Sequence, residues 1–205
     1  MTEIAGFVGQ VLPGGPEAGA PIVLLHGMGG DQTSLLDFGS QVAPGRTLVS
    51  LRGRQRWKDG YTFFLRHPDD RLDLDDLAVQ LPPLMSAIRQ IGREHGTPIL
   101  IGYSLGSIIT AALMAAEPGL IAGAVLLRPM PPGEGYAPGG LGGLPILMIG
   151  GDHDERRKPS DFPDLHEALV AGGADVTARL LDAAHALIVP GPDADLTRDW
   201  LTHNF

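Results

Sequence analysis

Short apolar runs alternate along most of this chain with longer segments in which apolar residues recur every three or four positions. The short runs are typical of buried strands, and the longer segments are typical of helices that pack one face on a core. We expect strands at about residues 5–11, 22–25, 47–51, 98–102, 123–127, 145–150 and 175–181. We expect helices at about residues 72–95, 105–117, 160–172 and 193–203. This alternation predicts an α/β fold, in which a mostly parallel sheet of about seven strands carries helices on both faces.

Proline and glycine mark the breaks in this pattern. Pro82-Pro83 lies inside the longest expected helix and should bend or break it, because proline lacks an N–H and clashes with the preceding turn. Two Gly/Pro-rich stretches, Pro13–Pro21 and Arg128–Pro145, stand out, and the first should form a surface hairpin or loop. No repeat, charge run or linker divides the chain, so we expect one domain over residues 1–205.

Composition narrows the range of partners. The hydrophobic content of 43% suffices for one core, and the net charge of −9 without a basic stripe argues against nucleic acid as a partner. The absence of cysteine excludes disulfides, thiolate metal sites and a cysteine nucleophile. The first residues lack the pattern of a signal peptide, and no run approaches the roughly 20 apolar residues of a membrane helix. We therefore expect a cytoplasmic protein that does not bind membranes.

The most informative motif is Gly102-Tyr103-Ser104-Leu105-Gly106, which joins an expected strand to an expected helix. A Gly-x-Ser-x-Gly sequence at such a turn is the nucleophile elbow of serine hydrolases. The turn is so tight that its flanking positions must be nearly free of side chains, and Gly102 and Gly106 meet that need. The motif predicts that Ser104 is a nucleophile presented above the sheet.

A serine nucleophile needs a base, and the base follows it in the chain order of this kind of site. His153, His166 and His185 follow Ser104. His185 lies just after the last expected strand among small neighbours that would let its ring reach the serine. His166 should be a solvated helix residue and His153 a loop residue, so His185 is the predicted base.

The carboxylate that orients this base should leave the end of the preceding strand, Ile146–Gly150. Asp152 and Asp154 both qualify, and the alternative for any single aspartate here is a loop cap or a surface charge. Asp182 fits that alternative. A metal site made by Asp152, His153 and Asp154 is a weaker hypothesis, because neighbouring residues seldom converge on one ion without remote ligands.

The expected strand Ile22–Leu25 continues into the glycine-rich turn His26–Asp31. Such a turn lets a backbone N–H face the site, so the Met28 and Leu105 N–H groups are the predicted oxyanion-hole donors. His26 should anchor the turn by hydrogen bonding. A phosphate-binding loop is less well supported, because the turn lacks the residues of a P-loop or a full Gly-x-Gly-x-x-Gly.

Aromatic residues cluster in a segment between a strand and a helix, where they either fill the core or line a substrate pocket. The candidate substrate-binding residues are Trp57, Tyr61, Phe63 and Phe64. Arg52, Arg54 and Arg66 flank this cluster. They could receive an acidic substrate group, although hydrogen bonds that pin the loop are the simpler interpretation.

With these residues in place, the chain resembles the phospholipase/carboxylesterase group of α/β-hydrolases, which are relatives of dienelactone hydrolases and acyl-protein thioesterases. The resemblance runs through Leu24–Asp31, Leu51–Arg54, Phe63–Arg66, Gly102–Gly106, Gly151–Asp154 and Ala184-His185. In that family the acid usually stands three residues after the glycine that ends the strand, as Gly-x-x-Asp, and counted from Gly151 the resemblance selects Asp154. It implies an α/β-hydrolase fold with a minimal lid and an open site, because only Arg128–Pro145 stands where larger hydrolases insert a lid domain.

The chain departs from the family pattern at three places. Ala184 stands where the family often has glycine, and Leu105 replaces a common glutamine. Glu155-Arg156-Arg157 stands where the family often has proline and an apolar pair. None of these changes removes a catalytic group. Dienelactone hydrolases proper use a cysteine, which this chain lacks, so that activity is not expected.

The leading hypothesis is a serine carboxylic-ester hydrolase that acts through an acyl-enzyme on small or short-chain esters. An acyl thioesterase is the nearest alternative, and a non-catalytic binding module on the same fold is an alternative of a different class. We expect no cofactor and no metal. Apolar residues exposed near the site would support a homodimer.

Overall fold

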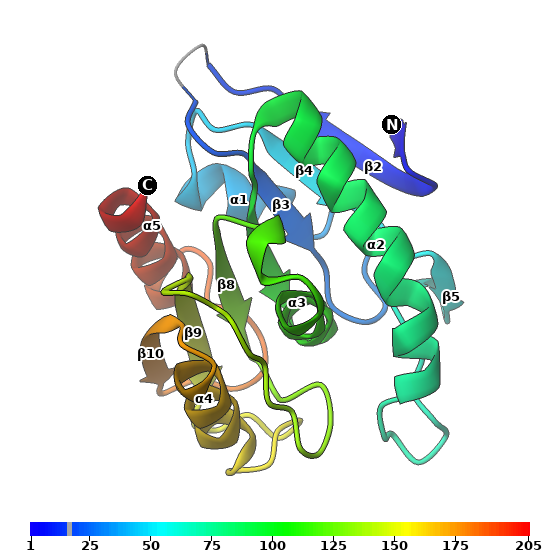
Figure 1. The fold of residues 1–205 in the computed structure, drawn as a ribbon, viewed down its shortest axis with the longest axis vertical. Helices are drawn as coiled ribbons and strands as arrows, with labels where there is room; N and C mark the ends of the chain where they lie inside the picture. The colour runs from blue at the N-terminus through cyan, green and yellow to red at the C-terminus, as the bar shows by residue number, and fades with distance from the viewer. Residues whose placement is uncertain (16–17) are drawn as a thin grey trace.

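The computed structural model describes residues 1–15 and 18–205, in which one eight-stranded sheet carries helices on both faces (Figure 1). The strands are β1 (Thr2–Ile4), β2 (Phe7–Leu12), β3 (Ile22–Leu25), β4 (Leu48–Leu51), β7 (Ile99–Tyr103), β8 (Gly123–Leu127), β9 (Pro145–Gly151) and β10 (Asp175–Leu181). Their order is β1-β2-β4-β3-β7-β8-β9-β10, and the strands from β4 to β10 are parallel. Only the β1–β2 and β2–β4 pairs are antiparallel. The predicted α/β-hydrolase fold with a mostly parallel sheet is confirmed.

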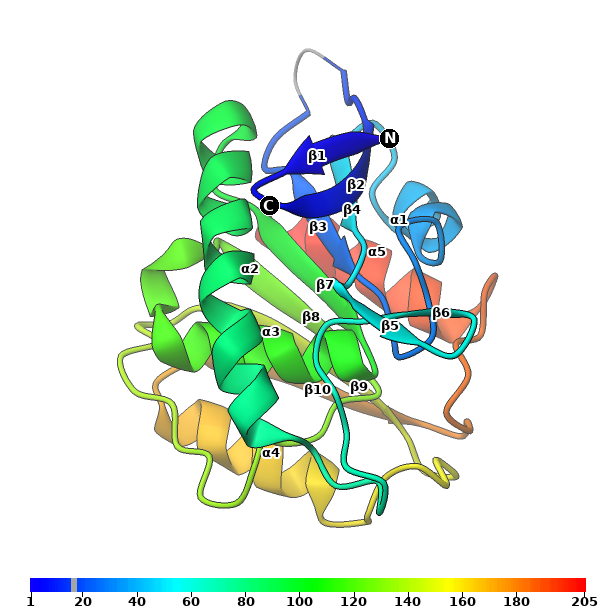
Figure 2. The ribbon, with the colours of Figure 1, turned by 90° about the vertical axis from the view of Figure 1, so that its right-hand side faces the viewer.

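The helices form two layers. They are α1 (Leu36–Val42), α2 (Leu74–His95), α3 (Leu105–Ala116), α4 (Asp161–Ala171) and α5 (Pro192–Asn204), with a 3-10 turn at Pro118–Leu120. Figure 2 shows α2, α3 and α4 on one side of the sheet and α1 and α5 on the other. Two further strands, β5 (Gln55–Trp57) and β6 (Gly60–Thr62), form a separate hairpin at the carboxyl end of β4.

The central strands are apolar at every position because both of their faces are covered. In β3, Val23 and Leu25 pack into the core cluster beneath α2 and α3, whereas Ile22 and Leu24 pack beneath α1 and α5. All four side chains are completely buried. The carboxyl ends of these parallel strands meet at one edge of the sheet, where ligands bind in open α/β folds.

The sequence pattern missed one strand of the main sheet. The run predicted as one strand at 5–11 begins after a tight turn, in which Ala5 and Gly6 have φ of 45° and 82°. This turn folds Thr2–Ile4 back onto the next strand as an antiparallel partner. The sheet therefore has eight strands rather than about seven.

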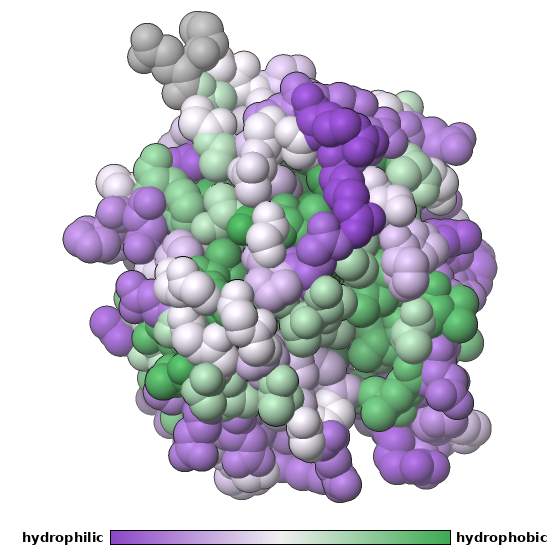
Figure 3. Space-filling model, viewed as in Figure 1, coloured by the Kyte–Doolittle hydropathy of each residue, from purple (hydrophilic) through white to green (hydrophobic). Residues whose placement is uncertain are grey.

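Of the two predicted effects of Pro82-Pro83, a break does not occur, because α2 is continuous from Leu74 to His95, and a bend stays a prediction. The carbonyl groups that lose a helical partner belong to Ala78 and Val79, which are exposed, so water can satisfy them. The two helical hydrogen bonds that the prolines remove therefore lie on the solvent-facing side of α2. Figure 3 shows a strongly hydrophilic surface over the C-terminal half of this helix.

The Arg128–Pro145 stretch contains no helix and reaches β9 as an extended loop. It packs onto the body of the protein through the buried Leu141 side chain, and the Tyr136 hydroxyl donates to the Ala111 carbonyl at 2.8 Å. The other expected loop, Pro13–Pro21, includes residues 16 and 17, which lie outside the described residues. In the part of the chain that is described, no helix combines the length and apolar character needed to cross a membrane.

Candidate active site

Ser104 lies between β7 and α3 with φ of 53° and ψ of −111°, a backbone conformation that residues other than glycine rarely adopt. Its backbone N–H donates to the Leu127 carbonyl of the next strand at 2.9 Å, which fixes the turn against the sheet. A Cβ at Gly106 would collide with the Leu25 carbonyl. The tight packing of α3 against β3 therefore requires glycine here. The strain at Ser104 is maintained by this packing and is typical of functional sites.

The structure brings together Ser104, His185 and Asp154. The Nε2 atom of His185 lies 2.8 Å from Ser104 Oγ, and its Nδ1 atom lies 2.7 Å and 2.9 Å from the two Asp154 carboxylate oxygens. Asp154 is 2% exposed at its side chain and also accepts from the Arg156 N–H at 2.9 Å. A hydroxyl, an imidazole and a carboxylate in this arrangement can generate a serine nucleophile.

The other candidate acid has a different environment. Asp152 is partly exposed and accepts from the Ala183 N–H at 3.2 Å, so it caps the loop that leads to His185. His153 points to solvent and lies 3.1 Å from an Asp182 carboxylate oxygen. This exposed group brings Asp152, His153 and Asp182 together, but Asp154 is not part of it.

The electrostatic setting of His185 favours its neutral form. Burial lowers its pKa below the ordinary value of 6.5, the hydrogen bond that His185 donates to Asp154 raises it, and the charges of Arg157 and Arg156 lower it. The net direction is downward. A neutral imidazole at neutral pH can accept a proton from a serine hydroxyl.

A buried ion pair holds the His185 loop in place. The Arg128 and Asp193 side chains are both completely buried and joined by two hydrogen bonds of 2.7 and 2.8 Å. Arg128 also donates to the carbonyls of Ala184 and Ala186 at 2.9 and 3.0 Å. These residues flank His185. Sequence analysis missed this contact, because a lone arginine after a strand gives no signal of its partners.

The second residue that sequence analysis missed is Arg157. Its Nη2 atom lies 3.3 Å from Ser104 Oγ. Its guanidinium group is held by the Arg128 carbonyl, to which Nε and Nη2 donate at 2.9 and 2.7 Å. A positive side chain therefore contacts the candidate nucleophile directly.

The glycine-rich turn after β3 is fixed from both sides. The Gly53 N–H donates to His26 Nε2 at 3.0 Å, which leaves Nδ1 to donate to the Gly27 carbonyl at 2.6 Å. Burial lowers the pKa of His26, and this pair of bonds requires its neutral form. On the other side, the turn pairs with Tyr61, because Gly29 N–H donates to the Tyr61 carbonyl at 2.8 Å.

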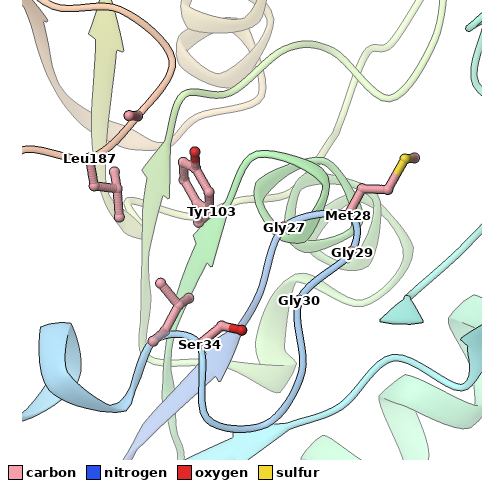
Figure 4. A pocket seen from close by; sticks show the side chains of 9 residues that line it. Gly27, Met28, Gly29, Gly30, Ser34, Tyr103 and Leu187 are labelled. Carbon is pink, nitrogen blue, oxygen red and sulfur yellow. The ribbon is translucent and has the colours of Figure 1, made fainter. Parts of the chain in front are cut away.

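The Met28 and Leu105 N–H groups are the proposed oxyanion donors, and they lie in the turn after β3 and at the start of α3. Leu105 is the first residue of α3, and the backbone N–H groups in the first turn of a helix have no acceptor within the helix. Met28 stands in the turn beside Ser104, since a Cβ on the preceding Gly27 would lie 3.4 Å from the Ser104 Cβ. Figure 4 shows that the Met28 side chain points away from Tyr103 and Leu187.

A cavity of about 340 Å³ lies beside these residues (Figure 4). It is lined by Gly27, Met28, Gly29, Gly30, Ser34, Leu35, Tyr103, Ala186 and Leu187. The turn after β3 forms one side, Leu187 forms the other, and Tyr103 stands between them. Its volume is at the lower end of the roughly 300–1,000 Å³ of small-molecule sites.

The four candidate aromatic residues do not line this cavity. Phe63 and Phe64 are 2% and 0% exposed and belong to the core, so the structure favours the core interpretation for them. Trp57 and Tyr61 are partly exposed on the β5–β6 hairpin. Tyr61 pairs with the turn after β3, and the chain then enters the core, where Phe63 and Phe64 pack in the cluster beneath α2 and α3.

The flanking arginines have structural contacts. The Arg52 guanidinium stacks 3.9 Å from the centre of the Tyr61 ring. Arg54 lies 5.7 Å from the centre of the Phe7 ring. Arg66 donates to the Asp70 carbonyl at 2.7 Å and closes the loop before α2.

The sheet order, the strained serine turn and the serine–histidine–aspartate contacts together define an α/β-hydrolase. Residues 22–203 match the model of the alpha/beta hydrolase family, and the chain belongs to that family. A protein of Bacillus subtilis (strain 168), named "Putative hydrolase MhqD", is 30% identical over 183 residues, which cover 87% of this chain and 90% of that protein.

Solved structures agree with this assignment. A carboxylesterase from Mesorhizobium loti is 32% identical, with a TM-score of 0.90 over 98% of this chain and 97% of that chain. A Bacillus cereus carboxylesterase shares the fold at 24% identity, with a TM-score of 0.89 over 97% of this chain and 95% of that chain. The predicted resemblance to the carboxylesterase group of α/β-hydrolases is confirmed.

Proposed function

We propose that this protein is a serine carboxylic-ester hydrolase that acts through an acyl-enzyme on small or short-chain esters. The observation that carries the proposal is the continuous set of hydrogen bonds from Asp154 through His185 to Ser104 Oγ. The carboxylesterase neighbours support the same class of reaction.

In the first step, Ser104 Oγ attacks the ester carbonyl while His185 Nε2 takes the hydroxyl proton. Asp154 holds the imidazole by Nδ1 and stabilises the imidazolium that forms. The Met28 and Leu105 N–H groups receive the negative charge that develops on the carbonyl oxygen, and one such donor contributes about 3–4 kcal/mol to the transition state.

The collapse of this intermediate passes the proton from His185 to the leaving alcohol and leaves an acyl group on Ser104. Water then attacks the acyl-enzyme, with His185 again acting as base, and releases the acid. The preference for small esters is supported by the cavity of about 340 Å³ and by the short loop between β8 and β9, which holds no lid helix.

The test measures hydrolysis of p-nitrophenyl esters from acetate to laurate by the wild type and by Ser104→Ala. We expect activity on the shorter esters that the substitution abolishes, and a mass increase equal to the acyl group on Ser104 in quenched samples. Equal activity of both proteins would refute Ser104 as the nucleophile. If neither protein hydrolyses any ester, the non-catalytic binding module becomes the better explanation.

A matched pair of substitutions tests the acid. Asp154→Asn should lower kcat by about 10³- to 10⁴-fold, because the amide no longer holds the imidazole in the correct tautomer. Asp152→Asn, two residues away and partly exposed, should change kcat by less than about threefold, since exposed charges are well screened. A larger loss at Asp152 would reverse the assignment.

A further inference from the structure

Arg157 is held in place beside the candidate nucleophile by contacts that do not neutralise its charge. Its guanidinium donates twice to the Arg128 carbonyl and once to the Arg156 carbonyl at 3.0 Å. A fourth contact joins Nη2 to Ser104 Oγ at 3.3 Å. All of these acceptors are uncharged. Arginine has five N–H donors, and these contacts use the Nε hydrogen, one Nη1 hydrogen and both Nη2 hydrogens, so one Nη1 hydrogen remains available.

The positive charge of Arg157 has no close counter-ion. Among residues 1–15 and 18–205, no carboxylate oxygen lies within the 4.0 Å of an ion pair with Arg157. Two carboxylates act on this charge from beyond that distance, and both have other partners: Asp154 accepts from His185, and Asp161 accepts from the Lys158 N–H at 2.8 Å. Arg66 adds a second positive charge near this group. Burial lowers the pKa of Arg157, the charges of Asp154 and Asp161 raise it, and the charge of Arg66 lowers it.

A partly desolvated cation without a counter-ion is costly unless a ligand pairs with it. Arginine stays protonated in proteins, so this site cannot avoid the cost by losing the proton. The planar guanidinium is well suited to a carboxylate, which it can bind through two parallel N–H groups. When Ser104 Oγ leaves its contact with Nη2 to attack the substrate, a second donor becomes free beside the first.

We propose that Arg157 binds a carboxylate group of the substrate, so that the preferred substrates are esters that carry a carboxylate close to the scissile bond. This proposal rests on the proposed esterase function and specifies its substrate class. A carboxylate oxygen hydrogen-bonded to Nη2 lies within about 6 Å of Ser104 Oγ, since an N–H···O bond spans about 2.9 Å. That distance fits monoesters of short dicarboxylic acids.

The experiment compares two ethyl esters of nearly equal shape, monoethyl succinate and ethyl levulinate. The first ends in a carboxylate, and the second ends in a methyl ketone. A pH-stat measures kcat and KM for both esters with the wild type, Arg157→Gln and Lys158→Gln. Lys158 is exposed, and its replacement removes the same charge one residue further along the chain.

We expect the wild type to prefer monoethyl succinate by about 10- to 100-fold in kcat/KM, as a charge-assisted hydrogen bond to a substrate implies. Arg157→Gln should abolish this preference mainly by raising KM for the succinate, and Lys158→Gln should keep it. Succinate should inhibit ethyl levulinate hydrolysis by the wild type, whereas neutral succinamide should not. This inhibition tests the proposal even if Arg157→Gln folds poorly.

Other outcomes would overturn the proposal. If the wild type hydrolyses ethyl levulinate as well as monoethyl succinate, Arg157 does not select a carboxylate, although the esterase function stands. If Arg157→Gln lowers kcat for both esters equally, Arg157 positions Ser104 instead of binding substrate. If the wild type hydrolyses neither these esters nor p-nitrophenyl esters, the proposed function itself fails, and the assignment of Arg157 fails with it.

Discussion

The ion pair between Arg128 and Asp193 offers the sharpest test of what holds the site together. Asp193→Asn keeps the shape of the side chain and removes its charge. The Arg128 guanidinium would then be a completely buried cation with no counter-ion. The substitution also weakens the acceptor of the Ile188 N–H, which lies 2.8 Å from Asp193 Oδ2.

The expected magnitude follows from this burial. Removal of one partner from a buried ion pair costs about 3–5 kcal/mol, because the remaining charge stays desolvated. The free energy of unfolding of a typical domain is about 5–15 kcal/mol, so this loss is a large part of the total stability. For a chain of this length, each kcal/mol lowers the Tm by about 2–4 °C, which gives a fall of about 6–20 °C.

Urea unfolding followed by circular dichroism measures the effect, and Asp195→Asn is its control. Asp195 lies two residues further along α5 and pairs with Arg198, with side chains 60% and 43% exposed. Loss of this exposed pair should cost less than about 1 kcal/mol. Equal losses at Asp193 and Asp195 would refute the argument, because they would mean that solvent screens the Arg128 pair as well as the surface pair.

Three further predictions concern the serine turn and the base. The pH at which kcat/KM for neutral esters falls to half its plateau should lie below 6.5, because burial lowers the pKa of His185 and keeps the imidazole neutral to lower pH; a midpoint above 6.5 would contradict this direction. Ser104→Gly should abolish hydrolysis and yet raise the free energy of unfolding by about 1 kcal/mol, because glycine adopts positive φ without strain. An unchanged or lower free energy of unfolding would count against strain at this turn. Gly106→Ala should lower the free energy of unfolding by at least about 3 kcal/mol, because its Cβ would collide with the Leu25 carbonyl. The control Gly119→Ala, which has open space around it, should change this free energy by less than about 0.5 kcal/mol. Comparable urea midpoints for the two variants would contradict the prediction and show that α3 can shift away from β3.

The architecture could be predicted from the sequence because its main signals are local. Buried parallel strands such as Ile22–Leu25 are continuous apolar runs, and α2 repeats its apolar positions at helical spacing. The short elements α1 and β5 escaped because seven and three residues give too few periods to recognise. The expectation of a break at Pro82-Pro83 overlooked that Ala78 and Val79 lie on the exposed side of this helix, where water can satisfy their carbonyl groups.

The candidate site was predictable to the extent that chain order constrains it. Ser104 stands out through its flanking glycines, and a histidine after the last strand follows from the order of elements in this fold. The choice between Asp152 and Asp154 needed either the family resemblance or the folded structure, since both residues follow the same strand. In the structure only Asp154 contacts His185, and Asp152 caps the neighbouring loop.

Arg128 and Arg157 mark the limit of sequence reasoning, because their contacts are set by the folded chain alone. Arg128 is 65 residues from Asp193 and 56 from Ala184, and nothing in its own neighbourhood indicates either partner. Its side chain holds the carbonyls on both sides of His185, while its backbone carbonyl accepts the guanidinium of Arg157. One buried residue thus positions the proposed base through its side chain and the proposed carboxylate-binding group through its backbone. Substitutions of Arg128 should therefore disturb the His185 loop first, because any residue at this position keeps the carbonyl that holds Arg157.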